Sequence, residues 1–319
     1  MNDPSYRVHP FDYDALPLVV PVRRQRQRLW LHLLLFAATV VTTLAVGAQL
    51  TYNFSHGLPA FDLNRSLNPF SVVWGHPERL WWGLPFSMAL LGILLAHEMG
   101  HYLACRYYGI AVSYPYFIPA PTIIGTLGAF LRIRQPIRSR RVLFDVGVAG
   151  PLAGFVVALP LLIAGMAVSR ADALVNEPGV VSFGSPLLVR FVEALFFPGV
   201  PAASIELHPV ARAAWVGLFA TALNLLPIGQ LDGGHILYSL IGDVHRKLSR
   251  VFAAMLLPLG YFLWPGWLLW AVLMLILGTR HPVLFDPRPL DSGRRWLGAL
   301  ALVIFLLCFT PAPFTATTE

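Results

Sequence analysis

The apolar residues of the chain gather in long stretches separated by short polar segments. Five stretches are long enough to cross a bilayer as helices, near 29–50, 81–105, 142–168, 211–231 and 296–311. A sixth, 251–278, is interrupted by Pro265 and Gly266, which predicts either a hairpin of two short spans or one kinked helix. The pattern predicts an all-α polytopic membrane protein with about six to seven transmembrane helices.

The basic residues predict the orientation of these spans. An arginine-rich run at 23–28 precedes the first apolar stretch and indicates a cytoplasmic N-terminal segment, residues 1–28. The basic clusters that then fall inside lie at 132–141 and 246–250, and the outside loops, poor in basic residues, lie at 51–80 and 169–210. The arginines beyond 278 join the inside set only if 251–278 makes two passes, so the charges favour the hairpin.

Composition supports a membrane protein. The chain is 56% apolar and 12% charged, whereas a soluble domain carries roughly 25% charged residues. The formal net charge of +7 is spread over short clusters at the ends of the spans, so nucleic-acid binding is not expected. Cys105 and Cys308 lie in or beside apolar runs and are expected to be ordinary buried thiols.

One apolar stretch carries a pattern typical of metal chemistry. Residues 97–101 read His-Glu-Met-Gly-His near the end of the predicted span 81–105. In a helix, His97 and His101 lie one above the other on one face, where they can hold a zinc ion. Glu98 can then reach the metal-bound water. Ionisable side chains inside a membrane helix are costly, so the pattern indicates a functional site.

A zinc site also needs a third protein ligand, and Asp232 is the best candidate. It ends the predicted span 211–231, where Pro227 should interrupt the helix and Gly233-Gly234 permits a sharp turn back toward the metal. Asn224, a buried amide in the same segment, could hydrogen-bond a developing oxyanion. Both motif-bearing spans run from outside to inside, so the two motifs meet on the same side of the bilayer.

With these motifs the chain resembles the site-2 protease family of intramembrane zinc metalloproteases. Three segments match in the order typical of the family: 97–101, the glycine-rich 144–155 and 224–235. The resemblance implies one zinc ion held by His97, His101 and Asp232, with Glu98 as catalytic base and Asn224 beside the scissile carbonyl.

The resemblance also implies substrates and an unusual loop. The family cleaves transmembrane segments, often of single-span membrane proteins within the bilayer, in regulated intramembrane proteolysis. Many bacterial members carry a PDZ domain in an outside loop. The loop 169–210, about 40 residues here, is below the roughly 50 residues of a small domain. The chain would therefore be a member of this family that has no PDZ domain in the loop 169–210. Pro186 to Phe197 in this loop is predicted to be an amphipathic segment at the membrane interface.

Residues 126–134 alternate with a period of two, with Leu127, Leu131 and Ile133 on one face, which predicts a strand. Together with Tyr116–Pro121 it resembles the membrane-re-entrant β-hairpin of the family. Such a strand must be shielded by protein or a water-filled cavity. We expect its free edge to pair with an unwound segment of the substrate.

These features divide the chain into four parts. They are a cytoplasmic segment (1–28), a first transmembrane helix with its outside loop (29–80), the metalloprotease core (81–240) and the C-terminal transmembrane helices (241–319). The expected location is a prokaryotic cytoplasmic (inner) membrane, with a plastid membrane left open for a mature chain.

The sequence also allows other functions for the protein and other roles for single residues. A zinc or proton-coupled transporter could use the same ligands, although no inverted repeat is found. An inactive relative could bind single-span proteins without cutting them. The glycines of 144–155 are expected to serve close packing, Asp145 to cap its helix or face the cytoplasmic interface, and the other histidines, including His32 and His245, to be interfacial or in loops.

Overall fold

The computed structural model describes residues 27–62, 68, 70–171, 179–277 and 288–316, so the predicted cytoplasmic segment lies almost wholly outside the described residues. The helices are α1 (Leu29–Ser55), α2 (Leu84–Tyr107), α3 (Arg140–Ala167), α4 (Leu187–Phe196), α5 (Pro209–Asn224), α6 (Asp232–Ile241), α7 (His245–Phe262), α8 (Gly266–Leu277) and α9 (Ser292–Cys308). The strands are β1 (Tyr116–Pro119), β2 (Thr126–Phe130), β3 (Arg170–Ala171), β4 (Val181–Phe183), β5 (Ile205–Glu206) and β6 (Phe314–Ala316). The prediction of a mostly helical protein is confirmed.

Within the described residues, three helical segments are long and apolar enough to cross a membrane. They are Leu29–Ser55, Pro77–Tyr107 and Arg140–Ala167, where a 3-10 turn, Pro77–Gly83, extends the second. They coincide with the first three predicted spans. The predicted span 211–231 is shorter as a helix: α5 has 16 residues and ends at Asn224, three residues before Pro227, which cannot continue a helical hydrogen-bond pattern.

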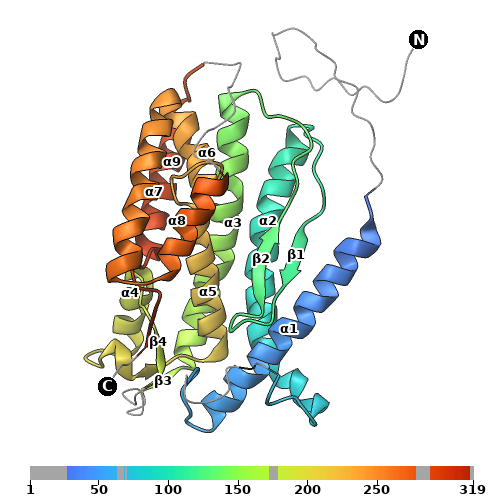
Figure 1. Cartoon of the computed structure of the whole chain (residues 1–319), viewed down its shortest axis with the longest axis vertical. Helices are drawn as coiled ribbons and strands as arrows, with labels where there is room; N and C mark the ends of the chain where they lie inside the picture. The colour runs from blue at the N-terminus through green and yellow to red at the C-terminus, as the bar shows by residue number, and fades with distance from the viewer. Residues whose placement is uncertain (1–26, 63–67, 69, 172–178, 278–287, 317–319) are drawn as a thin grey trace.

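The centre of the molecule is a bundle of α2, α3 and α5 (Figure 1). Small residues allow the helix backbones to approach closely. A Cβ atom on Gly100 of α2 would lie 2.4 Å from the carbonyl oxygen of Ala149 in α3, and one on Gly165 would lie 2.3 Å from the backbone nitrogen of Ala211 in α5. Around these contacts lies the main apolar core, which includes Leu90 and Leu218. The bundle therefore holds α2 and α5, the two helices with the motifs, against a common neighbour.

The interrupted stretch 251–278 forms two helices rather than one kinked helix. α7 and α8 are joined around Pro265 and pack against each other. A Cβ atom on Gly260 would lie 2.6 Å from the Leu268 side chain, so the absence of a side chain there permits the close approach. The two helices form a helical hairpin, and that each of them crosses the membrane stays a prediction.

β1 and β2 form an antiparallel hairpin that lies between α1 and α2 (Figure 1). The Thr42 hydroxyl of α1 donates to the carbonyl oxygen of Gly125, at 2.6 Å. β2 is shorter than the predicted strand: it ends at Phe130, and Ile133 forms only an isolated bridge with Val112. Within the hairpin, an irregular register and a positive φ of 98° at Gly128 interrupt the alternation. Leu127 is consequently 70% exposed, whereas Leu131 and Ile133 pack on a second apolar cluster around Cys105.

The histidine of α1 was expected at an interface or in a loop, and it lies in the first turn of the helix rather than in a loop. His32 is buried, its ring lies 4.0 Å from that of Tyr116, and its Nδ1 lies 3.2 Å from the carbonyl oxygen of Pro115. It helps to hold the start of the hairpin against α1.

Candidate metal centre

The two histidines of the HExxH pattern occupy one buried face of α2. His97 and His101 are separated by one helical turn, and both are below 8% exposed. The His101 Nδ1 lies 2.8 Å from the carbonyl oxygen of Val146 in α3. Donation of Nδ1–H to that carbonyl leaves Nε2 as the free lone pair, the usual way in which a second hydrogen bond orients a metal-binding imidazole.

Glycines of α3 make room for both imidazoles. A Cβ atom on Gly150 would lie 2.1 Å from the His101 Nε2, and one on Gly154 would lie 3.2 Å from the His97 Cβ. Gly147 lies against His235 and the backbone of Asp232. The predicted packing role of the glycine-rich segment therefore fits the geometry. These glycines form the wall on which the two histidines lie.

Asp232 enters the centre from the other motif. Its Oδ2 lies 3.3 Å from the His97 Nε2 and 3.2 Å from the His101 Nε2. The turn that brings it there differs from the prediction: residues 225–231 make the bend, Asp232 begins α6, and Gly233 and Gly234 lie inside that helix. Side chains at these glycines would collide with the preceding loop, because a Cβ on Gly233 would lie 2.0 Å from the carbonyl oxygen of Leu225. Their role is close packing rather than turning.

A buried brace from α7 supports this bend. The Ser249 hydroxyl accepts from the backbone N–H of Gly229, at 3.0 Å, and donates to the carbonyl oxygen of Pro227, at 3.1 Å. The His245 Nε2 lies 2.9 Å from the same hydroxyl. Both side chains are fully buried, and His245 is the first residue of α7 rather than a loop residue. Sequence reasoning missed Ser249 because a lone serine in an apolar helix carries no local signal.

The donor set fits a zinc ion. The three ligand atoms of His97, His101 and Asp232 lie within 4.8 Å of one another. Ligand atoms bound to zinc at about 2.0–2.1 Å in a tetrahedron are roughly 3.3 Å apart, and the two histidine–carboxylate separations are 3.3 and 3.2 Å. Two imidazoles and a carboxylate are ligands that zinc prefers.

The two remaining predicted residues lie beside the donor set. Glu98 is 6% exposed, and the backbone of Leu131, just beyond β2, lies beside its carboxylate. The Asn224 Nδ2 lies 3.3 Å from the His97 Nε2. The structure thus brings all five predicted residues together, from α2, from the end of α5 and from the start of α6.

A polar cluster near the N-terminal ends of α3 and α9 was not predicted. The Arg294 guanidinium binds both carboxylate oxygens of Asp145, with contacts of 2.8 and 2.6 Å, and the Tyr108 hydroxyl donates to the same carboxylate. Burial and the adjacent Asp145 carboxylate raise the pKa of Tyr108 to about 12. Asp145 therefore joins α3 to α9 and to the end of α2 instead of capping its own helix or simply facing an interface.

Comparison with known proteins gives a family match and several relatives. The model of the family described as Peptidase family M50 matches residues 85–264. The chain is 33% identical over 235 residues to the probable zinc metalloprotease EGY1, chloroplastic, of Arabidopsis thaliana, which covers 72% of this chain and 43% of that protein. It is 34% identical over 237 residues to EGY1 of Oryza sativa subsp. japonica, covering 72% and 40%. The chain thus spans about two fifths of the length of these curated relatives.

The same relatives overturn the predicted location. They are named as chloroplastic proteins of plants, so the expectation of a prokaryotic inner membrane is wrong. Hydropathy and flanking arginines could not have distinguished the two, because the length and charge rules for a transmembrane helix describe the bilayer and not the organelle that contains it.

Proposed function

Because the chain belongs to peptidase family M50, we propose that it is an intramembrane zinc metalloprotease that hydrolyses peptide bonds within transmembrane segments of other membrane proteins. The resemblance to the site-2 protease family is confirmed by this membership. The observation that carries the proposed activity is the convergence of the His97, His101 and Asp232 ligand atoms beside the buried Glu98 carboxylate.

His97, His101 and Asp232 would hold the metal. When bound, zinc supplies a Lewis acid that polarises the scissile carbonyl and lowers the pKa of its bound water toward ~7. The Val146 carbonyl fixes the orientation of His101. The Ser249 brace holds the loop that presents Asp232. Both contacts keep the ligands in place before substrate arrives.

Glu98 acts as the general base and acid. Its carboxylate takes a proton from the attacking water and returns it to the leaving amine. The backbone of Leu131 lies beside one side of the carboxylate and leaves the other side to the reacting water. Asn224, beside His97, donates from its side-chain amide to the carbonyl oxygen as that oxygen gains negative charge.

The β1–β2 hairpin binds the substrate as an added strand. A transmembrane helix hides its peptide bonds in i→i−4 hydrogen bonds, so it must unwind before cleavage. The edge of β2 at the exposed Leu127 offers backbone groups to the unwound segment. β2 ends at Phe130, and the backbone of the next residue, Leu131, lies beside the Glu98 carboxylate. The hairpin would therefore guide the substrate to the base, from a re-entrant position within the membrane.

The surrounding helices complete a polytopic protein of about six to seven spans. α5 and α9 are crossing segments of 16 and 17 residues, and α7 and α8 form the short hairpin. The chloroplastic relatives favour a chloroplast membrane as the location. The substrates are single-span membrane proteins, and the cleavage belongs to regulated intramembrane proteolysis.

The test is cleavage of a tagged single-span substrate in vesicles that contain the full chain or its Glu98→Gln variant. Glu98→Gln keeps the size of the side chain and all three ligands but removes the base, so cleavage should cease. Glu78→Gln, at a mostly exposed acid in the turn before α2, is the matched control and should cleave normally. Cleavage by Glu98→Gln at the parent rate would reject the proposed role. Zinc uptake that survives in Glu98→Gln without any cleavage would favour the transporter instead.

A further inference from the structure

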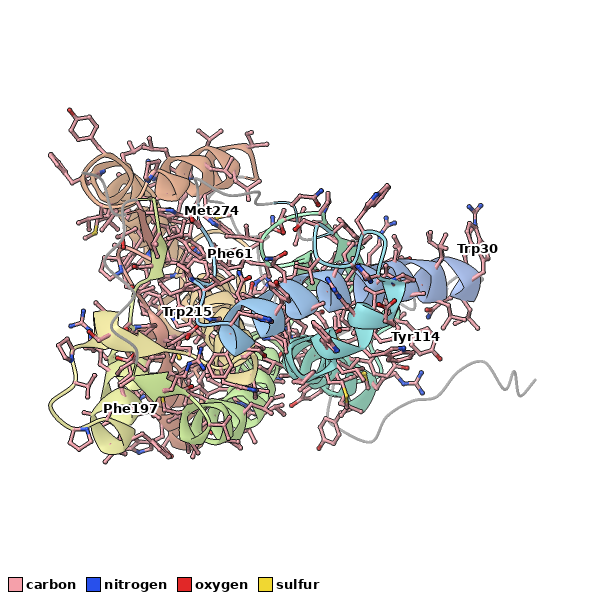
Figure 2. The ribbon with its side chains drawn as sticks, turned by 90° about the horizontal axis from the view of Figure 1, so that it is seen from below. Trp30, Phe61, Tyr114, Phe197, Trp215 and Met274 are labelled. Carbon is pink, nitrogen blue, oxygen red and sulfur yellow. The ribbon has the colours of Figure 1, made fainter. Side chains whose placement is uncertain are left out.

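A second polar site lies at the end of the bundle opposite the metal centre, where α4, β3 and β4 are found (Figure 1). A partly open cavity of about 560 Å³ is bordered by α4, β4, the segment around Ala60 and the start of α5. Phe197 and Trp215, labelled in Figure 2, border it. Trp215 precedes Asn224 on α5 by nine residues, about 14 Å at 1.5 Å per residue. The cavity is therefore separate from the metal centre.

One wall of the cavity carries an unsatisfied carboxylate. Glu193 is 6% exposed. Its Oε1 accepts from the Ser185 hydroxyl, at 3.0 Å, but its Oε2 is buried and has no hydrogen-bond partner within the described residues. Buried polar atoms in native proteins are nearly always satisfied, and an exception calls for an explanation. Burial raises the pKa of the Glu193 carboxyl, because a charge without a partner is disfavoured there.

Glu193 lies on the side of α4 that borders the cavity. The outer face of the helix carries exposed Leu187, Phe191 and Leu195, as the predicted interfacial segment requires. The opposite face, with Arg190, Glu193 and Phe197, borders the cavity. The buried side of α4 also carries Leu188, Val189 and Val192, so Glu193 is an acid within an otherwise apolar buried face and borders the cavity.

The opposite wall supplies hydrogen-bond donors and apolar surface. The Arg212 Nε donates to the carbonyl oxygen of Leu207, at 3.0 Å, and its guanidinium lies over the Phe183 ring, 5.1 Å from the ring centre. These contacts hold the guanidinium in place at the cavity wall. Val181, Ile205 and Trp215 provide much of the remaining lining. Glu206 and Arg190 also line the cavity, but the Glu206 carboxylate is paired with Arg170 and the Arg190 Nε donates to the Ser185 carbonyl oxygen. The cavity thus combines one carboxylate oxygen without a hydrogen-bond partner, the fixed Arg212 guanidinium and an apolar surface.

We propose that this cavity binds the amino terminus of a peptide whose first residue is apolar. The terminal ammonium donates to the Glu193 Oε2, the first carbonyl oxygen accepts from Arg212, and the apolar side chain lies against Trp215 and Ile205. A metal ion is a poor match, because one carboxylate oxygen is a small fraction of the ligands that a cation requires. An anionic lipid headgroup is disfavoured beside an unpaired carboxylate.

The test uses the full chain reconstituted with zinc and a tripeptide, Leu-Ala-Ala, labelled with a fluorophore at its carboxyl end. Fluorescence anisotropy should show saturable binding. Acetylation of the peptide amino group should weaken it by about tenfold or more, because a hydrogen bond to a charged group is lost. This comparison uses the unaltered protein and so does not depend on how a variant folds.

Variants then locate the site. Glu193→Gln should weaken binding of the free peptide to about the level of the acetylated one, whereas Glu78→Gln, at an exposed acid outside the cavity, should not. Glu98→Gln should bind normally, which separates this inference from the proposed protease activity. Equal binding of free and acetylated peptide, or full binding by Glu193→Gln, would overturn the proposal. Displacement of the peptide by phosphatidylethanolamine vesicles but not by phosphatidylcholine vesicles would assign the site to a lipid amine instead.

Discussion

Glycines at the metal centre and in the hairpin serve opposite purposes. A Cβ atom on Gly150 would lie 2.1 Å from the His101 ligand nitrogen, whereas one on Gly128 would meet nothing within 4 Å. Gly150 provides space in a closed site, and Gly128, with a φ of 98°, provides a backbone conformation at an open edge. The closed region suits chemistry that needs fixed ligands, and the open region suits binding of an extended chain. Substitutions at the two regions should therefore fail in different ways.

The largest effect is expected from Gly150→Ala. The added methyl group must displace the His101 imidazole, and misplacement of a reacting group by about 1 Å can cost 100-fold in rate. Cleavage of the single-span substrate should fall by about that factor or more, and zinc should be lost with it. Gly92→Ala, in the neighbouring membrane segment α2 and with open space around the new methyl group, should retain activity. Normal zinc binding and cleavage by Gly150→Ala would show that the glycine wall does not constrain the ligands.

A smaller loss is expected from Ser249→Ala. Removal of the hydroxyl leaves the Gly229 N–H without its partner and frees the bend that presents Asp232. Outer-shell partners of metal ligands typically contribute 10–100-fold to metal affinity or activity, so zinc affinity should fall by about tenfold. A competitive zinc chelator titration measures it, with Ser55→Ala at the exposed end of α1 as the control. Equal zinc affinities of the two variants would show that Ser249 does not hold the loop that presents Asp232.

Binding of the substrate to the β1–β2 hairpin should be detected by cross-linking, and substitutions in the hairpin should not change zinc binding. A Leu127→Cys substitution places a thiol on the edge of β2, where the side chain is 70% exposed. It should form a disulfide with a cysteine placed near the scissile bond of the substrate in a Glu98→Gln background. Leu302→Cys, at an exposed position of α9, should not. Cross-linking of both thiols with the same yield would contradict strand addition at β2.

The smallest effect concerns the Asp145 cluster and its dependence on pH. The pKa of Tyr108 is raised to about 12 in the folded protein, above roughly 10 in an unfolded chain. The folded state then binds more protons between these values, so stability is retained below pH 10 and lost as the pH rises toward 12. After allowance for solvent screening the loss is about 1 kcal/mol. Thermal unfolding from pH 9 to 12 should show this loss in the parent and a smaller one in Tyr108→Phe. Identical pH profiles of thermal unfolding for the parent and Tyr108→Phe would contradict the role of Tyr108 in this loss of stability.

The sequence predicted which side chains come together better than it predicted the path of the backbone around them. His97, His101 and Glu98 follow from one local pattern, and Asp232 follows from a second motif on the same side of the membrane. The bend at 225–231 and the start of α6 at Asp232 did not follow, because the loop geometry depends on contacts from Ser249 in α7. The link from Asp145 to Arg294 spans 149 positions, and no local pattern reports such a distant pair. The predicted location in a prokaryotic inner membrane was wrong, because hydropathy identifies segments that cross a bilayer and does not identify the organelle.

The central claim is that α2 and the start of α6 together hold one metal ion. Zinc content of the purified full chain, measured by plasma mass spectrometry, tests it most directly. We expect about one zinc per chain in the parent and in His76→Ala, an exposed histidine, and loss of zinc in His97→Ala, His101→Ala and Asp232→Ala. Circular dichroism should show that each variant keeps its helices. A folded Asp232→Ala variant that retains a full equivalent of zinc at the affinity of the parent would contradict the account.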